Sequence, residues 1–354
     1  RVKTLYNKKF RTIPEEEMKC YKASISELLK YDSKCIALGL SLKEATSLSK
    51  ENLDTFISKL NDYPTLKNDL AYLTSNDLSN ALLNKDMNRY FKFFFGLGKN
   101  FRTKNFNKLL DNETINKIAE DKKFEKFVRY IIFYDYLKNL QTSLLNVKNN
   151  KDMTSETLFL LGINAINHGE NDIAYSFFHD SYSKAYLRSG KDKALFWIYL
   201  ITDNKSFLYE LSKSWDNNLY SLYSKEILDV KVDNIVYDIE IPNTKSNYNI
   251  YDQFSWIKVL DDTKKNFDDL KLATYQNIFT SEETLPHYAY VLERYNKYKK
   301  QYYITPYKDL IKDYTPYNKV LVCSLGKQES RFIPSSISVS TAQGVMQIMP
   351  FLSK

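Results

Sequence analysis

Apolar and polar positions follow a helical spacing from Pro14 to about Val230, and short stops interrupt the pattern. The stretch "SLKEATSLS" begins with a capping box, in which Ser41 and Glu44 satisfy backbone donors at the start of a helix. Glycines mark stops between the predicted helices, at Gly39, Gly96, Gly98, Gly169 and Gly190. The pattern predicts a succession of short helices over this whole range.

One part of this range indicates how the helices pack. Five residues match the spacing L-G-x-x-small and A-x-x-x-F that is typical of tetratricopeptide-like helix pairs: Leu161, Gly162, Ala165, Ala174 and Phe178. Small residues let two antiparallel helices approach closely, while Phe178 fills the groove between them. Because the pattern does not recur cleanly one repeat later, we expect an irregular α-solenoid rather than a tandem array.

The pattern changes after Val230. In "VDNIVYDIEIPNT", apolar and polar residues alternate from Ile235 to Ile241, which predicts a strand that Pro242 ends. Helical stretches follow as a smaller linking unit, and a third unit begins near Tyr303. We therefore predict three parts: an α-superhelical domain over 1–230, a linker domain over 231–302 and a third domain over 303–354.

The composition favours a folded, all-α chain. Of 354 residues, 43% are hydrophobic and 15% aromatic, and only eight are glycine, which favours helix packing over disordered or loop-rich structure. Apolar runs such as Ala194 to Ile201 fall far short of the roughly 18 residues that cross a membrane, so no span is expected. The chain begins without methionine and without a basic and apolar leader; a leader removed during export or a shortened chain would each account for this.

Charge and metal-ligand spacing narrow the classes of partner. The formal net charge of +8 admits an anionic partner such as nucleic acid, a membrane surface or an acidic wall polymer. Lysines are interspersed with acidic residues, and no run of like charge is long enough for a binding arm, so nucleic acid is not expected. The histidines and cysteines lack zinc-ligand spacing, so no metal site is expected. Cys20 and Cys35 either bridge two neighbouring helices in an oxidising compartment or are two buried thiols.

The last predicted helix carries a candidate acid. Thr315 and Pro316 form a strong helix start, a hydroxyl N-cap followed by proline. Glu329 lies close to the predicted C-terminus, where the helix dipole and apolar neighbours favour a carboxyl group that keeps its proton, as a general acid must. An exposed glutamate that simply ends a helix is the alternative. The residues that share one face of this helix are Leu321, Leu325, Gln328 and Phe332.

The residues after the candidate acid extend the pattern. From Glu329 to Pro350 the chain reads "ESRFIPSSISVSTAQGVMQIMP", with a serine at 338. This stretch resembles the signature of soluble lytic transglycosylases, the family 23 glycoside hydrolases related to goose-type lysozyme, from the E-S-x-aromatic-x-P start to the G-x-M-Q-I-M-P end. Two positions depart from the family: Thr341, where glycine is common, and Ile333, where asparagine is common.

The resemblance implies an organisation and a location. Large members of this family carry a superhelical, ring-forming α-domain and a small linker domain before a lysozyme-like catalytic domain, and the three predicted parts fit that order. Residues 303–354 would be the N-terminal part of the catalytic domain, about its first third, because later family segments have no counterpart before Lys354. We therefore expect a fragment of a periplasmic enzyme that is itself nearly inactive.

The resemblance also implies a mechanism with one carboxylate and no cofactor. Most glycosidases use two carboxylates, whereas no Asp or Glu follows Glu329 here. Glu329 would protonate the glycosidic oxygen between N-acetylmuramic acid and N-acetylglucosamine and then, as carboxylate, accept the C6 hydroxyl proton, which gives a 1,6-anhydro ring. Ser338 would help to orient the reacting groups. If "GVMQIMP" is extended, Gln347 and Met349 share one face and line the groove, while Met346 points away.

Three functions are open at this point. The first is a periplasmic lyase whose partner is the glycan strand of peptidoglycan. The second is a helical scaffold or peptidoglycan-binding module whose lysozyme-like end is incomplete, and the third is a lysozyme-type hydrolase. The sequence indicates no particular protein partner.

Overall fold

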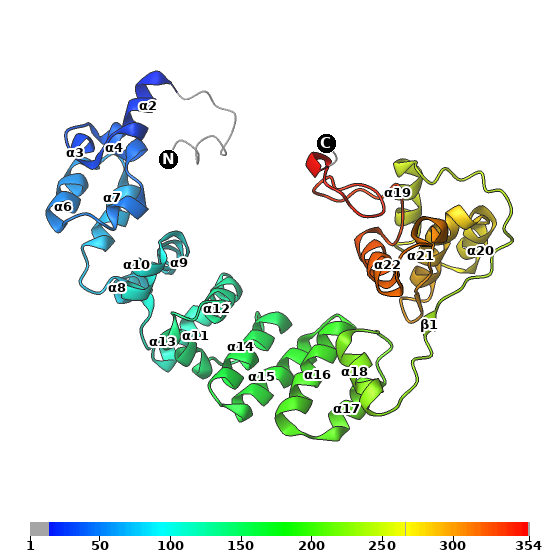
Figure 1. Ribbon diagram of the computed structural model, residues 1–354. Helices are drawn as coiled ribbons and strands as arrows, with labels where there is room; N and C mark the ends of the chain where they lie inside the picture. The colour runs from blue at the N-terminus through cyan, green and yellow to red at the C-terminus, as the bar shows by residue number, and fades with distance from the viewer. Residues whose placement is uncertain (1–13, 266, 353–354) are drawn as a thin grey trace. The chain divides into compact units, whose positions relative to one another are not determined.

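The chain divides into two compact units, Arg1–Ile201 and Thr202–Lys354. The computed structural model, drawn in Figure 1, describes residues 14–265 and 267–352 and is 62% helical. This confirms the predicted all-α class. The three-part division with boundaries after 230 and 302 stays a prediction, and its outermost residues, 1–13 and 353–354, lie outside the described ones.

The first unit is a series of short helices joined by short connections, which fits the predicted superhelix. Among the described residues up to Val230, no strand interrupts the series. Its elements are α2 (Glu15–Lys22), α3 (Ile25–Leu28), α4 (Ser33–Gly39), α5 (Leu42–Ala45), α6 (Lys50–Lys59), α7 (Pro64–Leu73), α8 (Leu78–Lys85), α9 (Met87–Gly96), α10 (Lys99–Phe106), α11 (Asn112–Ala119), α12 (Phe124–Phe133), α13 (Lys138–Ser143), η1 (Leu144–Asn146), α14 (Ser155–Asn167), α15 (Asn171–Lys184) and α16 (Arg188–Thr202).

The second unit is also mainly helical, with one small two-stranded sheet. Its elements are α17 (Lys205–Ser212), α18 (Leu219–Ile227), β1 (Ile235–Val236), α19 (Gln253–Asp262), α20 (Asp269–Ile278), η2 (Glu282–Thr284), α21 (Leu285–Tyr295), β2 (Gln301–Tyr302), η3 (Lys308–Ile311), α22 (Pro316–Ser330) and η4 (Pro350–Leu352).

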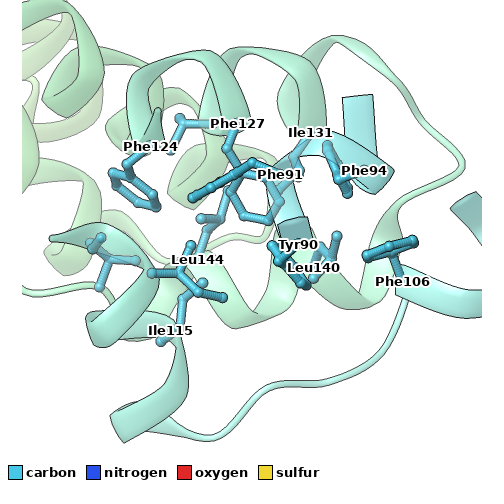
Figure 2. Packing of buried hydrophobic residues seen from close by; sticks show 14 of the residues in the cluster. Tyr90, Phe91, Phe94, Phe106, Ile115, Phe124, Phe127, Ile131, Leu140 and Leu144 are labelled. Carbon is cyan, nitrogen blue, oxygen red and sulfur yellow. The ribbon is translucent and has the colours of Figure 1, made fainter. Parts of the chain in front are cut away.

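Aromatic rings fill a large core in the first unit. Figure 2 shows Tyr90, Phe91 and Phe94 of α9 together with Phe127 of α12 in this cluster, and the ring centroids of Phe94 and Phe127 lie 4.6 Å apart. All four side chains are 1% exposed or less. Burying a ring of this size typically contributes a few kcal/mol. The aromatic content of the sequence is therefore used for packing between successive helices.

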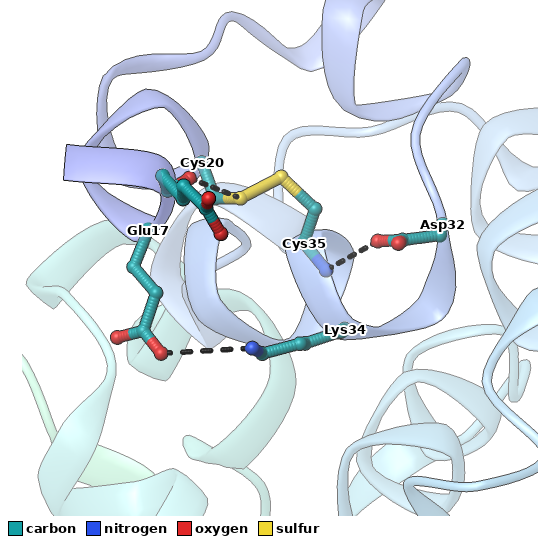
Figure 3. Close-up of a disulfide and its surroundings, with 6 residues drawn as sticks. Glu17, Cys20, Asp32, Lys34 and Cys35 are labelled. Atoms are coloured by element: carbon teal, nitrogen blue, oxygen red, sulfur yellow. Dashed lines mark hydrogen bonds and ion pairs between the residues drawn. A yellow bond between two sulfur atoms is a disulfide. The ribbon is translucent and has the colours of Figure 1, made fainter. Parts of the chain in front are cut away.

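A disulfide joins Cys20 of α2 to Cys35 of α4, which decides between the two predicted states of these cysteines (Figure 3). Beside it, the Lys34 ammonium lies 3.7 Å from the Glu17 carboxylate, and Asp32 accepts a hydrogen bond from the Cys35 N–H at 2.8 Å. A bridge across a loop of about 15 residues stabilises a fold by roughly 3 kcal/mol. Such bridges persist in oxidising compartments.

Helices α14 and α15 form the close pair predicted from their small residues. A Cβ atom on Gly162 would lie 2.5 Å from the nearest atom of the Phe178 ring, so only glycine fits against it. The ring cannot move aside freely, because Phe159 and Trp197 pack on it with centroid distances of 5.4 and 6.0 Å. Phe178 therefore fills the groove as the spacing predicts.

The strand predicted from Ile235 to Ile241 is wrong beyond Val236. Only β1 pairs, in parallel, with β2. Ile239 and Ile241 instead pack against the core of the second unit from an irregular segment. Alternating polarity marks a chain with one buried side, but a ladder also needs a partner strand, and β2 offers only two residues.

A buried histidine occupies the core of the second unit. His287 is fully buried among the rings of Tyr248, Trp256 and Phe279, whose centroids lie 5.1, 5.3 and 5.5 Å from its own. Neither ring nitrogen has a hydrogen-bond partner among the described residues. Burial lowers the pKa of His287 to about 3, so the side chain is neutral in the folded protein.

We expect Gly162→Ala to lower the free energy of unfolding by about 1–2 kcal/mol. Overpacking against the Phe178 ring costs typically 1–3 kcal/mol, which outweighs the gain of up to about 1 kcal/mol in helix propensity. Urea denaturation measures the difference. Gly96→Ala is the control, since a Cβ on Gly96 would meet nothing within 4 Å and the same propensity gain comes without a clash. Equal stability of the Gly162→Ala variant and the wild type would contradict the close packing.

We expect the second unit to lose stability on acidification because of His287. Its pKa is lower in the folded state than in the unfolded state, so unfolding takes up a proton as the pH falls from about 6.5 toward 3. The loss between pH 7 and pH 5 is on the order of 2 kcal/mol. Denaturant titrations at both pH values measure it. In His287→Phe, this part of the pH dependence should disappear.

Candidate active site

The candidate acid Glu329 lies one residue before the end of α22. The helix starts as predicted, with Pro316 as its first residue and with the Thr315 hydroxyl accepting a hydrogen bond from the Asn318 N–H at 3.3 Å. The Glu329 side chain is exposed and makes no hydrogen bond or ion pair with the residues that the structure describes. Its carboxyl group is therefore accessible to a large substrate.

The apolar surroundings expected for Glu329 are not formed by the described residues. Leu321 and Leu325 of the predicted face remain 46% and 43% exposed, and Gln328 is exposed as well. Phe332 alone of this face is buried, at 5% exposure. The described residues therefore do not bury the predicted apolar face beside Glu329, because α22 buries the side that carries Gly326 and Ser330.

The chain reverses direction directly after Glu329. Arg331 and Phe332 both take left-handed backbone conformations, with φ of 56° and 65°, and the Phe332 N–H donates to the Gly326 carbonyl at 3.1 Å. Gly326 makes this possible, since a Cβ there would lie 2.7 Å from the Phe332 ring. The next residue, Ile333, is fully buried in the core that also holds Trp256 and Phe279. The backbone beside Glu329 is thus anchored in the second unit.

The segment "GVMQIMP" contains a tight turn and is not an extended chain. Gln343 and Ile348 exchange backbone hydrogen bonds of 3.1 Å, and residues 344–347 turn between them. Gly344 and Gln347 have φ of 75° and 48°, which a strand does not allow. The condition under which Gln347 and Met349 would share one face is therefore not met, since the period of two holds only in extended backbone. Ser330 ties this turn to α22 by donating to the Val345 carbonyl at 2.7 Å.

The three predicted binding residues lie in this turn and the loop before it. The Ser338 hydroxyl accepts a hydrogen bond from the Ala342 N–H at 3.0 Å and so closes its own loop. The Gln347 side-chain Nε2 donates to the carbonyls of Ser336 and Gly344 at 3.0 and 2.9 Å. Met349 is half-buried. No hydrogen bond joins Ser338 or Gln347 to Glu329 among the described residues, and the roles of all three stay predictions.

A charged cluster that the sequence analysis missed lies behind the candidate acid. Glu293 of α21 is 3% exposed, and its Oε1 lies 2.8 Å from Nζ of Lys327. Arg331 pairs with Oε2 of the same carboxylate. Lys327 also donates to the Tyr302 carbonyl at 2.7 Å, and the Tyr302 N–H donates to Glu293 at 3.0 Å. Two cations that flank Glu329 in sequence therefore share one buried anion.

Burial affects the protonation of this cluster. It lowers the pKa of the Lys327 ammonium to about 8, and it lowers the pKa of the Arg331 guanidinium as well. Both remain charged at pH 7, where the Glu293 carboxylate offsets part of the cost of burial. The spacing of Lys327 and Arg331, four residues apart at a helix end, is the only signal in the sequence, and it does not indicate the partner on α21.

Two kinds of feature are absent from the described residues. No group of three or more His, Cys, Asp or Glu side chains among them is arranged to hold a metal ion. No helix among them combines the length and the apolar character that crossing a bilayer requires.

Comparison with known protein families finds a match at the C-terminal segment. Residues 312–354 match the family model described as the transglycosylase SLT domain. The match includes Glu329, Ser338, Gln347 and Met349, and it confirms the predicted resemblance for this segment. It indicates a domain of the transglycosylase class that acts on peptidoglycan. No curated protein matches the chain.

We expect Thr341→Gly to stabilise the loop that contains Ser338. Thr341 has a φ of 67°, a left-handed conformation that costs a β-branched residue roughly 1–2 kcal/mol, and glycine adopts it freely. The greater freedom of glycine in the unfolded chain offsets part of this gain. The net change, about 0.5–1 kcal/mol, is measured by chemical denaturation. Ser340→Gly is the matched control and should destabilise slightly; a loss of stability in Thr341→Gly as well would contradict the strained conformation.

Proposed function

We propose that this protein is a peptidoglycan lytic transglycosylase in which Glu329 is the catalytic acid and then the base. The observation that carries the proposal is the match of residues 312–354 to the transglycosylase SLT domain, with Glu329 exposed at the end of α22. The exposed carboxyl group has no partner among the described residues that would compete with a substrate oxygen. The proposed substrate is the glycan strand, cleaved at the β-1,4 bond between N-acetylmuramic acid and N-acetylglucosamine.

The proposed reaction uses one carboxyl group twice and consumes no water. Glu329 gives its proton to the glycosidic oxygen, the bond from that oxygen to C1 of the muramic sugar breaks, and N-acetylglucosamine leaves as an alcohol. The C6 hydroxyl oxygen of the same sugar then bonds to C1, and its proton passes to the Glu329 carboxylate. The product is a 1,6-anhydro ring, and Glu329 regains its starting state. The substrate's N-acetyl carbonyl steadies the positive charge at C1 between the two steps.

Ser338, Gln347 and Met349 are the proposed contacts to the substrate. The Gln347 Nε2 is used within the turn, while its Oε1 makes no hydrogen bond with the described residues and can accept one from a sugar. The Ser338 hydroxyl accepts from the Ala342 N–H and still has a proton to donate. Met349 offers an apolar surface to a sugar face. The hydrogen bond from the Ser330 hydroxyl to the Val345 carbonyl holds the turn close to the end of α22.

The proposed location is the periplasm, or another compartment outside the cytoplasm. The disulfide between Cys20 and Cys35 supports it, because such bridges form and persist in oxidising surroundings. Peptidoglycan, the proposed substrate, lies outside the inner membrane. The net charge of +8 suits an acidic wall polymer as the partner.

Glu329→Gln tests the proposal in the full-length protein. The change keeps the shape of the side chain but removes the transferable proton, so the rate should fall by about 10²–10⁴-fold while binding to peptidoglycan survives. Purified peptidoglycan is incubated with each protein, and the released muropeptides are identified by mass.

Glu240→Gln is the matched control, since Glu240 is also an exposed glutamate of the second unit. It should release anhydro-muropeptides at the wild-type rate. Anhydro products from Glu329→Gln at a similar rate would exclude Glu329 as the acid. Products with reducing ends from the wild type would favour a lysozyme-type hydrolase, and retention of the glycan without any product would favour a binding module.

A further inference from the structure

The buried carboxylate of Glu293 joins α21 to the last turn of α22. It accepts three interactions: the Lys327 ammonium at 2.8 Å, the Tyr302 N–H at 3.0 Å and the Arg331 guanidinium. The recess among these side chains has a volume of about 10 Å³, which leaves room for about one water molecule. The Lys327 and Arg331 cations therefore contact the Glu293 carboxylate directly, without an intervening water layer.

The two cations lie on the side of α22 that faces away from the candidate acid. Lys327 precedes Glu329 by two residues, which is about 200° around a helix of 3.6 residues per turn. Arg331 follows Glu329 by two residues and reaches the same carboxylate after the left-handed turn that ends the helix. The contacts of Lys327 and Arg331 thus set which way the opposite side, and with it Glu329, points.

Aromatic rings restrict the two cations further. The Lys327 ammonium lies 4.6 Å from the ring centroid of Tyr303. The Arg331 guanidinium lies 5.8 Å from the ring of Tyr290 and 5.6 Å from that of Tyr298. Each cation therefore has one anion and at least one ring as partners, and neither can swing away without losing both kinds of contact.

We propose that Glu293 is a positioning residue for the transglycosylase reaction. It fixes the orientation of the last turn of α22 about the helix axis and thereby directs the Glu329 carboxyl group at the scissile bond. This inference rests on the proposed role of Glu329. Apolar contacts keep the segment docked, since Phe332 packs on Gly326 and Ile333 is buried in the core. Such contacts tolerate a small rotation, whereas a buried carboxylate between two cations does not.

The reaction is sensitive to a rotation of this kind. A displacement of about 1 Å between a catalytic group and its target can cost on the order of 10²-fold in rate. Glu293→Gln keeps the size of the side chain but leaves two cations facing a neutral amide, so their mutual repulsion is no longer offset. The last turn then relaxes, while Ser338, Gln347 and Met349 keep their own local hydrogen bonds and packing.

The test measures kcat and KM separately on soluble, uncrosslinked glycan strands with the full-length protein. For Glu293→Gln, kcat per folded molecule should fall about 10–100-fold, and KM should stay within about twofold of the wild type. Glu293→Asp restores the charge and should recover part of the lost kcat. If Glu293→Gln does not fold, Arg331→Lys is the test instead. This change keeps a cation at a side chain that is 38% exposed, but it removes the planar guanidinium group that can bind a carboxylate with two N–H donors. The kcat of Arg331→Lys should then fall by about 3–10-fold.

Asp69→Asn is the matched control. Asp69 of α7 is also 3% exposed and also pairs with an arginine and a lysine, Arg89 at 2.6 Å and Lys92, but these ion pairs join α7 to α9 in the first unit. It should lower stability and leave kcat per folded molecule unchanged. Wild-type kcat per folded molecule in Glu293→Gln, or a rise in KM alone, overturns the positioning role. The proposed function fails separately, if Glu329→Gln remains active.

Discussion

Phe332 folds back against Gly326, and the arrangement of the C-terminal segment depends on that contact. It requires a glycine in the helix and two successive left-handed residues after it. Once Phe332 is seated, Ile333 enters the core of the second unit and Ser330 reaches the turn at Val345. The position of Glu329 is therefore set by residues on both sides of it in the chain. The face of α22 that carries Leu321 and Leu325 remains exposed beside it.

The features that could be predicted are those whose cause lies within a few residues. The capping box of Ser41 and Glu44 and the start of α22 at Thr315 form as expected, because a hydroxyl group satisfies an N–H three residues away. The pair of Gly162 and Phe178 was also predictable, since both the small residue and the ring belong to one helix hairpin. The all-α class follows from many such local signals acting together.

The features that could not be predicted depend on distant partners. The alternation after Ile235 indicated a strand, but only two residues find a partner, at Gln301 and Tyr302. The turn at residues 344–347 depends on Gly344 and on amide contacts of Gln347 to Ser336, which no periodic pattern encodes. The ion cluster was missed because Glu293 lies 34 residues before Lys327. A single sequence shows charges, but not which of them meet.

The bridge between Cys20 and Cys35 stabilises the first helices, and it also makes their folding depend on the redox conditions around the chain. In reducing surroundings both thiols would be free, and packing and the Glu17–Lys34 ion pair would still join α2 to α4. The sulfur–sulfur bond forms and persists in oxidising surroundings. If the protein is exported as proposed, folding of these first helices is completed after export, and the oxidation state of the two cysteines distinguishes exported molecules from those still in the cytoplasm.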